Sequence, residues 1–445
     1  MTSANMEQVS PGTLRRVIVA AGIGNFVEWF DFAVYGFLAT TIAQQFFPSG
    51  DASAALLKTF AVFAVAFAFR PLGGIFFGML GDRIGRKRTL AMTILLMAGA
   101  TTLIGLLPTY AAIGVMAPIL LSLIRCAQGF SAGGEYAGAC AYLMEHAPSD
   151  KRAWYGSFIP VSTFSAFAAA AVVAYALEAS LSAEAMGSWG WRLPFLIAAP
   201  LGLVGLYLRW KLDETPAFQA VTQDHAVAHS PLKDTLRNHG AAICCLGAFV
   251  SLTALSFYMF TTYFATYLQV AGGLSRATAL LVSLIALLFA AAICPLAGLY
   301  SDRVGRRMTV MTACALLIVV VYPSFLMASS GSFAASVVGV MLLAIGAVLC
   351  GVVTAALLSE TFPTHTRYTA SAITYNMAYT LFGGTAPLVA TWLISTTGSN
   401  LSPAFYLIAI ALLALAGGLA LPETSRISLH DVAAQEKAEG VSASA

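Results

Sequence analysis

The residues with the clearest chemical potential are five charged side chains that lie inside long apolar runs. Three are acids, Glu28, Asp31 and Glu135, and two are bases, Arg70 and Arg125. An ionisable group at such depth is costly unless it faces a protein interior or a watered cavity, so its default role is to bind a proton, an ion or a substrate. The sequence therefore predicts a polar site inside an apolar molecule.

Among these five residues the acids outnumber the bases by one. If two carboxylates pair with the two guanidinium groups, the third has no internal counter-ion, and removal from water favours its protonated form. Glu28 and Asp31 are three residues apart on one helix face, where joint ionisation is opposed. We expect a proton-coupling site in which Asp31 is the first candidate, Glu28 the second and Glu135 the third. The alternative is that the acids only hold neighbouring helices together through the arginines.

The two arginines are candidate ligands for a substrate carboxylate, because guanidinium presents a planar fork of hydrogen-bond donors. Arg70 is the slightly better candidate, since Pro71 and two glycines follow it and a helix kink there would widen a cavity. For Arg125, a structural partnership with Glu28 or Glu135 is the alternative.

Aromatic residues in the first and seventh apolar runs could surround an ammonium group through cation–π attraction. The eleventh run adds neutral hydrogen-bonding groups. The alternative for all of them is helix packing. The side chains that we assign to substrate binding beside the arginines are Trp29, Tyr35, Tyr258, Tyr263, Tyr375 and Asn376.

The elements that must position these residues are transmembrane helices. The chain has 445 residues, of which 59% are hydrophobic and only 10% charged, with a mean hydropathy of +0.82. Such a composition excludes a soluble globular protein, and in lipid each apolar run must satisfy its backbone as a helix. We expect an all-α polytopic membrane protein with spans at 17–43, 56–80, 89–107, 115–145, 155–178, 192–210, 241–270, 277–300, 308–328, 333–360, 369–396 and 403–421.

The spans divide into two bundles of six. We expect a polar N-terminal tail at 1–16, a first bundle at 17–210, a central loop at 211–240, a second bundle at 241–421 and a C-terminal tail at 422–445. Alternating the connections between sides places 18 of the 23 Lys and Arg residues with the N-terminus. Because positive residues mark the cytoplasmic side, we predict that both termini and the central loop are cytoplasmic.

Three short motifs occur in both halves in the same order. Gly78-x-x-x-Asp82-Arg83 recurs 220 residues later as Gly298-x-x-x-Asp302-Arg303, and Pro148 with its flanking acid and arginine recurs 215 residues later. Acidic residues beside Thr215 and Thr424 end spans six and twelve. Parallel six-span repeats place a binding site at their interface near the midplane. We expect the motif residues to form gates at the helix turns: Asp82, Arg83, Arg86, Asp302, Arg303, Arg306, Glu145, Arg152, Glu360 and Arg367.

With these motifs the whole chain resembles a major facilitator superfamily transporter. Within that superfamily, Glu28-x-x-Asp31-Phe32, Arg70-Pro71, the Gly-Gly-Glu-Tyr stretch that contains Glu135, and Trp189-Gly-Trp191-Arg192 resemble the metabolite:proton symporters. That family includes importers of proline and betaine, citrate, 2-oxoglutarate and shikimate, and the stretches around Asp31 and Glu135 are most similar to the proline/betaine members. The resemblance implies the major facilitator fold and loop contacts that hold one access state and break in the other.

The expected function is import of a small carboxylate-bearing metabolite coupled to protons, with a zwitterion such as betaine or proline as the first choice. A di- or tricarboxylate or a shikimate-type substrate is the alternative, and a passive facilitator or an exporter is a further one. The chain has no Gly-x-x-x-x-Gly-Lys-Ser/Thr motif for a nucleotide-driven pump, and Cys244 and Cys245 lack the spacing of a metal site. We therefore expect no enzyme, cofactor, metal or nucleic-acid partner, and a monomer in the bilayer of a bacterial inner membrane.

Overall fold

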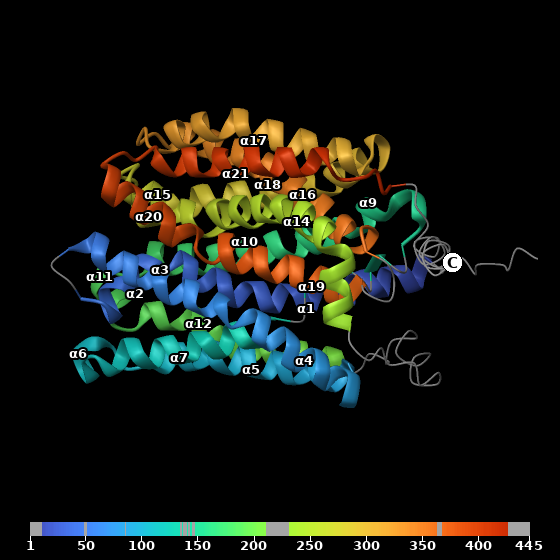
Figure 1. Cartoon of the computed structure of the whole chain (residues 1–445). Coiled ribbons are helices and arrows are strands. Elements are labelled where there is room, and N and C mark those ends of the chain that lie inside the picture. Colours follow the sequence, from blue (N-terminus) through green and yellow to red (C-terminus); the bar gives the residue numbers. More distant parts are fainter. Residues whose placement is uncertain are drawn as a thin grey trace, which may run out of the picture.

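The computed structural model describes residues 11–48, 51–84, 86–133, 136, 140, 143–144, 147–210, 231–362 and 367–425. Within these ranges the side chains of 11–17, 20–21, 78–79, 81–90, 149, 208–210, 231–239 and 367–369 are not described. Among the described residues, all regular secondary structure is helical, as the apolar composition predicts (Figure 1).

The N-terminal half contains the helices of the first six predicted spans and their connections. They are α1 (Pro11–Phe37), α2 (Ala39–Phe46), α3 (Ala52–Ala68), α4 (Arg70–Ile84), α5 (Arg86–Leu106), α6 (Tyr110–Ile113), α7 (Met116–Ser131), α9 (Arg152–Gly156), α10 (Phe158–Ser180), α11 (Ala183–Ser188) and α12 (Leu193–Trp210). Short 3₁₀ turns at Ser149–Lys151 and Gly190–Arg192 precede α9 and α12.

The C-terminal half repeats this pattern with two π-helical interruptions. Its helices are α14 (Pro231–Tyr258), α15 (Phe264–Val270), α16 (Arg276–Val304), α17 (Arg306–Ala328), α18 (Phe333–Glu360), α19 (Arg367–Ala378), α20 (Ala386–Thr397) and α21 (Ser402–Leu419). The π-helical segments are η3 (Met259–Tyr263) and η4 (Tyr379–Gly383), which lie within predicted spans seven and eleven.

The spans agree with the prediction in place, although not all in length. Nine described segments are long and apolar enough to cross a membrane, and a tenth is the pair formed by Gly22–Phe37 and Ala39–Phe46. The two further predicted spans contain shorter apolar helices, Ala91–Leu106 and Met116–Ser131. Predicted span one is bent by 63° between the two members of its pair, and α14 begins at Pro231, ahead of the predicted start of span seven at 241.

Local sequence signals place several helix ends. The Ser275 hydroxyl accepts a hydrogen bond of 3.2 Å from the backbone N–H of Thr278 and so caps the start of α16. The same helix ends at Gly305, whose φ of 95° is a conformation that favours glycine. Gly305 thereby sets the turn into α17 and the position of the Asp302–Arg306 motif that flanks it.

The two halves meet along two pairs of helices that are equivalent in the repeat. Helix α10 packs along α16, and α3 packs against α20, so spans five and eight form one seam and spans two and eleven the other. Because span two corresponds to span eight and span five to span eleven, the seams are exchanged by the internal symmetry. Their arrangement agrees with the parallel repeats predicted from the motifs.

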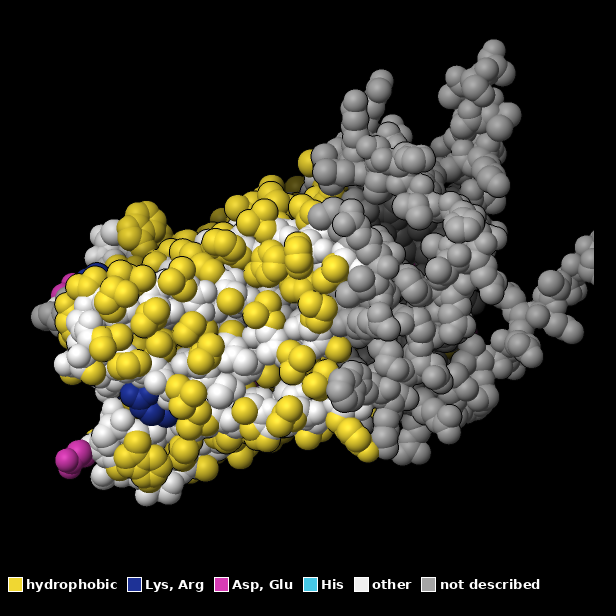
Figure 2. Space-filling view, turned by 90° about the horizontal axis from the view of Figure 1, so that it is seen from below, with side chains coloured by type: hydrophobic (Ala, Val, Ile, Leu, Met, Phe, Trp, Pro, Cys, Tyr) yellow, Lys and Arg dark blue, Asp and Glu magenta, His cyan; other side chains and the backbone are white. Residues whose placement is uncertain are grey.

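The surface is apolar along the length of the helices. In the view of Figure 2, hydrophobic side chains cover the middle of the described surface, and the charged side chains in view gather near one end. Large exposed apolar residues, such as Leu72, Ile75, Leu203 and Val319, contribute to this surface. Such a surface is suited to lipid contact.

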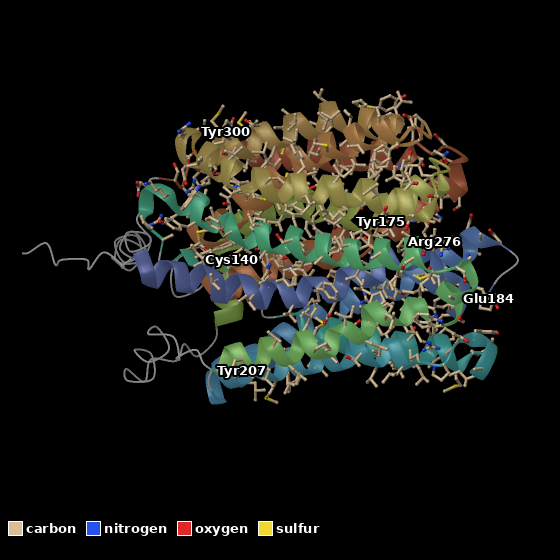
Figure 3. The ribbon with its side chains drawn as sticks, turned by 180° about the vertical axis from the view of Figure 1, so that it is seen from behind. Cys140, Tyr175, Glu184, Tyr207, Arg276 and Tyr300 are labelled. Carbon is tan, nitrogen blue, oxygen red and sulfur yellow. The ribbon has the colours of Figure 1, made fainter. Side chains whose placement is uncertain are left out.

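The bundle has two distinct ends. Helix α1 begins and α21 finishes at the same end, which we call the terminal end, and α9 lies there too (Figure 1). The opposite end carries α6 and α11, and we call it the loop end. Figure 3 shows Tyr300 toward the terminal end and Arg276 and Glu184 toward the loop end.

Candidate functional site

The charged residues predicted from the sequence come together inside the N-terminal half. Glu28 and Asp31 lie on α1, Arg70 begins α4 after a break in the helix at Phe69, and Arg125 lies on α7. All four side chains are buried, with exposed fractions of 0 to 4%. Glu135 lies outside the described residues. The described part of the site thus has two acids and two bases.

Arg70 pairs with Glu28 and is surrounded by aromatic rings. Its Nη2 atom is 3.8 Å from Glu28 Oε1 and donates a hydrogen bond of 3.4 Å to the carbonyl oxygen of Ala132. Its guanidinium carbon is 5.3 Å from the ring centre of Phe67 and 6.0 Å from that of Trp29. The Nε and Nη1 atoms have no hydrogen-bond partner within the described structure. Buried guanidinium N–H groups without a partner are costly, so this site is suited to an additional acceptor.

Arg125 forms a second, separate arrangement. Its Nη1 atom donates a hydrogen bond of 2.8 Å to Gln128 Oε1, and the Gln128 amide donates to Thr101 Oγ1 at 2.6 Å. The guanidinium carbon is 4.2 Å from the ring centre of Tyr35, a cation–π contact. Nε and Nη2 have no hydrogen-bond partner among the described residues. Gln128 therefore fixes the Nη1 side of Arg125, while Nε and Nη2 can donate to a further acceptor.

Among the described residues, Asp31 is a carboxylate that neighbours this second arrangement. Its polar neighbours are Thr101 and Arg125, and neither carboxylate oxygen has a hydrogen-bond partner among the described residues. The side chain is 1% exposed. Asp31 is therefore a buried carboxylate whose described cationic neighbour is Arg125.

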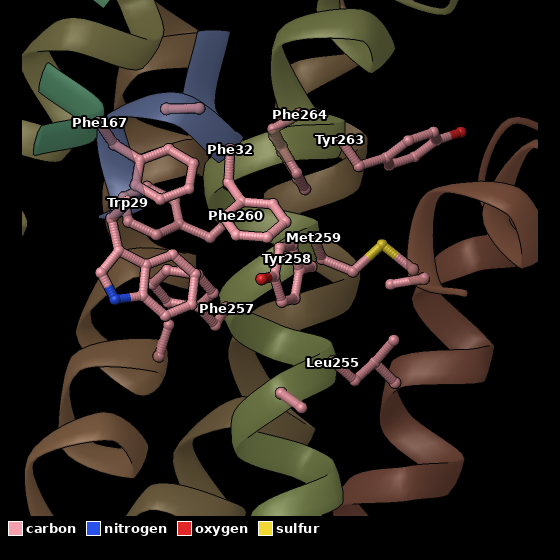
Figure 4. Packing of buried hydrophobic residues seen from close by; sticks show 14 of the residues in the cluster. Trp29, Phe32, Phe167, Leu255, Phe257, Tyr258, Met259, Phe260, Tyr263 and Phe264 are labelled. Atoms are coloured by element: carbon pink, nitrogen blue, oxygen red, sulfur yellow. The ribbon is translucent and has the colours of Figure 1, made fainter. Parts of the chain in front are cut away.

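Tyr258 connects the arginines to the C-terminal half. Its ring centre is 6.3 Å from that of Trp29 and 5.2 Å from that of Phe67, and its hydroxyl has no hydrogen-bond partner within the described structure. Arg70, Glu28 and Arg125 are all among its electrostatic neighbours. Figure 4 shows Tyr258 beside Phe257 and Trp29, where span seven of one half meets span one of the other.

The other predicted substrate ligands divide into two groups. Tyr35 lies under Arg125 and donates a hydrogen bond of 2.9 Å to the carbonyl oxygen of Thr59. Tyr263 points away from Trp29 in Figure 4 and contacts Phe60, with ring centres 6.2 Å apart. Trp29, Tyr35 and Tyr258 thus surround the arginines, whereas Tyr263 lies apart.

Tyr375 and Asn376 form contacts between the two halves. The Tyr375 ring stacks on Tyr136 at 4.5 Å with an interplanar angle of 7°. The Asn376 Nδ2 atom donates a hydrogen bond of 3.1 Å to the carbonyl oxygen of Gly133. A Cβ at Gly133 would lie 2.1 Å from the carbonyl oxygen of Arg70, so this close approach of α4 requires glycine.

Several predicted gate residues form a buried network at the terminal end. The Arg306 guanidinium binds Glu360 through two hydrogen bonds of 3.1 Å and Asp302 through one of 2.9 Å. Arg152 of the other half lies 3.8 Å from Glu360. Arg303 is exposed. The side chains of Asp82, Arg83, Arg86 and Arg367 and the whole of Glu145 lie outside the described residues.

Asp302 joins the halves directly. Its two carboxylate oxygens accept hydrogen bonds from the backbone N–H groups of Ala153 and Trp154 on α9, at 3.0 and 2.9 Å. A carboxylate at the start of a helix satisfies free N–H groups and interacts favourably with the helix dipole. This contact joins span eight to the start of span five at the terminal end.

Glu423 supports the same network from the segment that follows α21. Its oxygens accept hydrogen bonds from the backbone N–H groups of Arg306 and Arg307, at 2.8 and 3.1 Å. Partial burial raises the pKa of the Glu423 carboxyl, but hydrogen bonds from the backbone N–H groups of Ser425, Arg306 and Arg307 outweigh that effect and leave the pKa below its ordinary value. Glu423 therefore fixes the start of α17, where Arg306 begins.

We expect Glu360→Gln to lower the free energy of unfolding by roughly 3 kcal/mol, because Arg306 and Arg152 would lose a shared charged partner while Arg306 keeps Asp302. Chemical or thermal unfolding of the purified protein in detergent measures the effect. Glu184→Gln, which changes an exposed acid at the loop end, is the matched control and should be neutral. Equal stability of the two variants would contradict a structural role for the pair.

Sequence reasoning gave no role to three polar residues of this region, and it did not assign Tyr379, one of the hydrogen-bonding groups of the eleventh run, to the site. Gln128 and Thr101 hold Arg125, and Tyr136 and Tyr379 stack with Tyr375 from either side of the interface between the halves. Gln128 is three residues after Arg125, so the helical period predicts that the two side chains share a helix face. The stacking of Tyr136 and Tyr379 on Tyr375 cannot be read from the sequence, because it depends on how span eleven packs against span four.

Comparison with known proteins gives one consistent result. The Major Facilitator Superfamily model matches residues 21–384 and 273–443. The chain is 38% identical over 435 residues to the proline/betaine transporter of Salmonella typhimurium, covering 96% of this chain and 87% of that protein. It is also 38% identical over 427 residues to the glycine betaine/proline/ectoine/pipecolic acid transporter OusA of Dickeya dadantii, covering 94% and 85%.

Among solved structures, the proton:xylose symporter XylE bound to 6-bromo-6-deoxy-D-glucose is similar in fold. Its TM-score is 0.74 at 18% sequence identity, with 96% of this chain and all of that chain covered. Together, the family match and the relatives confirm the resemblance seen in the motifs. The chain belongs to the Major Facilitator Superfamily and is a multi-pass membrane transporter rather than an enzyme.

Proposed function

We propose that this transporter is a proton-coupled symporter that imports a small zwitterion, with betaine or proline as the first choice. The observation that carries the proposal is the buried Arg70–Glu28 pair at 3.8 Å, with unpartnered guanidinium nitrogens among aromatic rings and with Asp31 nearby. The two relatives named above are transporters of proline and betaine, which supports this substrate class.

The substrate carboxylate binds Arg70 in this proposal, and Arg125, which contacts the same Phe32 ring as Arg70, is a second ligand for it. Each guanidinium has two nitrogens free of hydrogen-bond partners in the described structure, which suits a carboxylate fork. The free hydroxyl of Tyr258, which interacts electrostatically with both arginines, adds one donor. A carboxylate at this point satisfies buried donors that otherwise have no acceptor.

The substrate ammonium faces the rings of Trp29 and Tyr258. In the described state Arg70 itself lies 6.0 Å from the Trp29 ring centre, so this ring already accommodates a cation. A quaternary or secondary ammonium over such a face is attracted by about 2 kcal/mol when both are out of water. The carboxylate of the same molecule then lies on the arginine side, which matches a compact zwitterion.

The coupled proton binds a carboxylate of the N-terminal half, with Asp31 first, Glu28 second and Glu135 third. A substrate carboxylate on Arg70 competes with Glu28 for the guanidinium, and a proton on one acid removes the resulting excess of negative charge. With Glu135 included, the interior has three acids and two bases, so one proton and one zwitterion leave it neutral. A dianion would need two further protons, which disfavours a dicarboxylate.

Transport follows from alternating contacts at the two ends of the bundle. The Asp302–α9 contact holds the terminal end, and at the loop end Arg276 of the C-terminal half lies 3.6 Å from Glu178 of the N-terminal half. Opening one end requires its contacts to part while the other set remains. From the distribution of Lys and Arg, we assign the terminal end to the cytoplasm of a bacterial inner membrane, with a lipid-embedded monomer as the working unit.

Uptake into proteoliposomes under separately imposed pH and voltage gradients tests the proposal. With a panel of betaine, proline, citrate, 2-oxoglutarate and shikimate, we expect betaine or proline to accumulate when the outside is acidic. Cotransport of one proton with a zwitterion moves one positive charge, so an inside-negative potential should also drive uptake. Transport of a dianion alone, or uptake that ignores both gradients, would contradict the proposal.

A further inference from the structure

A strip of span eleven from Tyr375 to Thr380 contacts the N-terminal half near Arg70. Besides the Tyr375–Tyr136 stack and the Asn376–Gly133 hydrogen bond, Thr380 Oγ1 donates a hydrogen bond of 2.9 Å to the carbonyl oxygen of Phe67. Residues of the strip therefore contact both span two and span four. A hydrogen bond to a backbone carbonyl breaks when the helices separate, so the strip belongs to one access state.

Three tyrosine rings stack on one another here: Tyr375 and Tyr379 of the strip, and Tyr136 of span four. Tyr375 has Tyr136 stacked at 4.5 Å and Tyr379 stacked at 3.9 Å. Because two rings cannot stack on one face of Tyr375 together, both of its faces are covered, and it has no face for a substrate ammonium. The stack thus differs from the rings around Arg70 and from the cage expected for an ammonium ligand.

The stack lies between the charged site and the terminal end. Tyr375 and Tyr379 are electrostatic neighbours of Arg70, and Tyr379 is also a neighbour of Tyr258. On the other side, the thiol of Cys140 is within hydrogen-bonding reach of Tyr136, and Figure 3 shows Cys140 in the terminal half of the molecule. Cys140 is 1% exposed, so its thiol is closely packed in this structure.

Span eleven changes its helical form at this position. The π-helical segment η4 begins at Tyr379, directly after α19 ends at Ala378. Single π-helical turns inside α-helices are frequent at functional sites, and their looser hydrogen bonding gives the helix a place to bend. The part of span eleven that carries Tyr375 is therefore the part best placed to move relative to span four.

We propose that the Tyr136–Tyr375–Tyr379 stack is the gate that closes the substrate site toward the terminal end. When its rings are stacked, the site is sealed, and when Tyr375 leaves Tyr136, the carboxylate and ammonium positions open to that side. Removal of a ring should favour the open arrangement, because offset stacking adds attraction beyond the buried area. This gate rests on the proposed function only in that it requires alternating access.

The native Cys140 thiol provides the measurement. A variant that keeps Cys140 and replaces the other six cysteines is purified in nanodiscs, so that a maleimide reaches both ends, and the rate of alkylation by N-ethylmaleimide is followed by mass spectrometry. We expect Tyr136→Leu to raise this rate about tenfold. Tyr136→Phe should not raise it, since phenylalanine retains the stacking and only the hydroxyl beside the thiol is lost.

Tyr375→Leu and Tyr375→Phe repeat the test from the other half of the protein. They show whether Tyr136→Leu acts by opening the gate or only by uncovering the thiol beside it. Parent-like alkylation in both leucine variants, or equal increases in leucine and phenylalanine variants, would overturn the gate. Size-exclusion chromatography reports folding of each variant.

The measurement needs neither a substrate nor a gradient. The alkylation result is therefore independent of the uptake result: the gate can be supported even if zwitterion uptake fails, and it can be refuted even if uptake succeeds.

Discussion

Asp31→Asn is expected to abolish accumulation of substrate against its gradient while substrate exchange across the membrane continues. Asn cannot take up or release a proton, but it has nearly the same shape and it suits a buried position without charge. With one proton per substrate, a pH difference of one unit supports about tenfold accumulation at zero voltage, since both correspond to about 1.4 kcal/mol. The variant should reach only equal concentrations on the two sides.

The measurement uses proteoliposomes with the membrane potential clamped by potassium and an ionophore. Accumulation under a pH difference and exchange of labelled for unlabelled betaine are recorded from the same preparation, so exchange controls for folding and binding. Glu28→Gln is the matched comparison, because Glu28 lies on the same helix but contacts Arg70. Parent-like accumulation by Asp31→Asn would place coupling elsewhere, with Glu135 the remaining candidate outside the Arg70 pair.

The sequence singles out the buried charged residues because buried charge is rare in an apolar chain. Glu28, Asp31, Arg70 and Arg125 stand out against their neighbours, and the structure brings all four into one region. Likewise, three of the motif residues that we assigned to gates, Asp302, Arg306 and Glu360, form one network in the structure. In both cases a polar group in lipid needs a partner, and few partners are available.

Tertiary geometry decided what the sequence did not predict. Tyr375 and Tyr263 were grouped with the substrate ligands because they lie on the right spans, but a tyrosine has no charge that reveals its neighbour. The 63° bend between α1 and α2 could not be predicted from a proline, because the bend falls at Leu38. Which face of a helix meets the other half is set by packing along its whole length, which periodicity alone does not resolve.

The paired guanidinium of Arg70 should contribute most of the binding free energy for the substrate carboxylate. We expect Arg70→Gln to weaken betaine binding about a hundredfold, because two charge-assisted hydrogen bonds of about 1.5 kcal/mol each are lost. The same change leaves Glu28 in a buried site without its cation, so the single variant combines lost binding with lost stability.

Arg70→Gln with Glu28→Gln separates these two effects. The double variant has neither buried charge, so its unfolding free energy should recover toward that of the parent. Its affinity for betaine, measured by calorimetry or by scintillation proximity, should remain about a hundredfold weaker, since no guanidinium is restored. Recovery of affinity together with stability would mean that Arg70 serves only to balance Glu28, and that the substrate carboxylate binds at Arg125 instead.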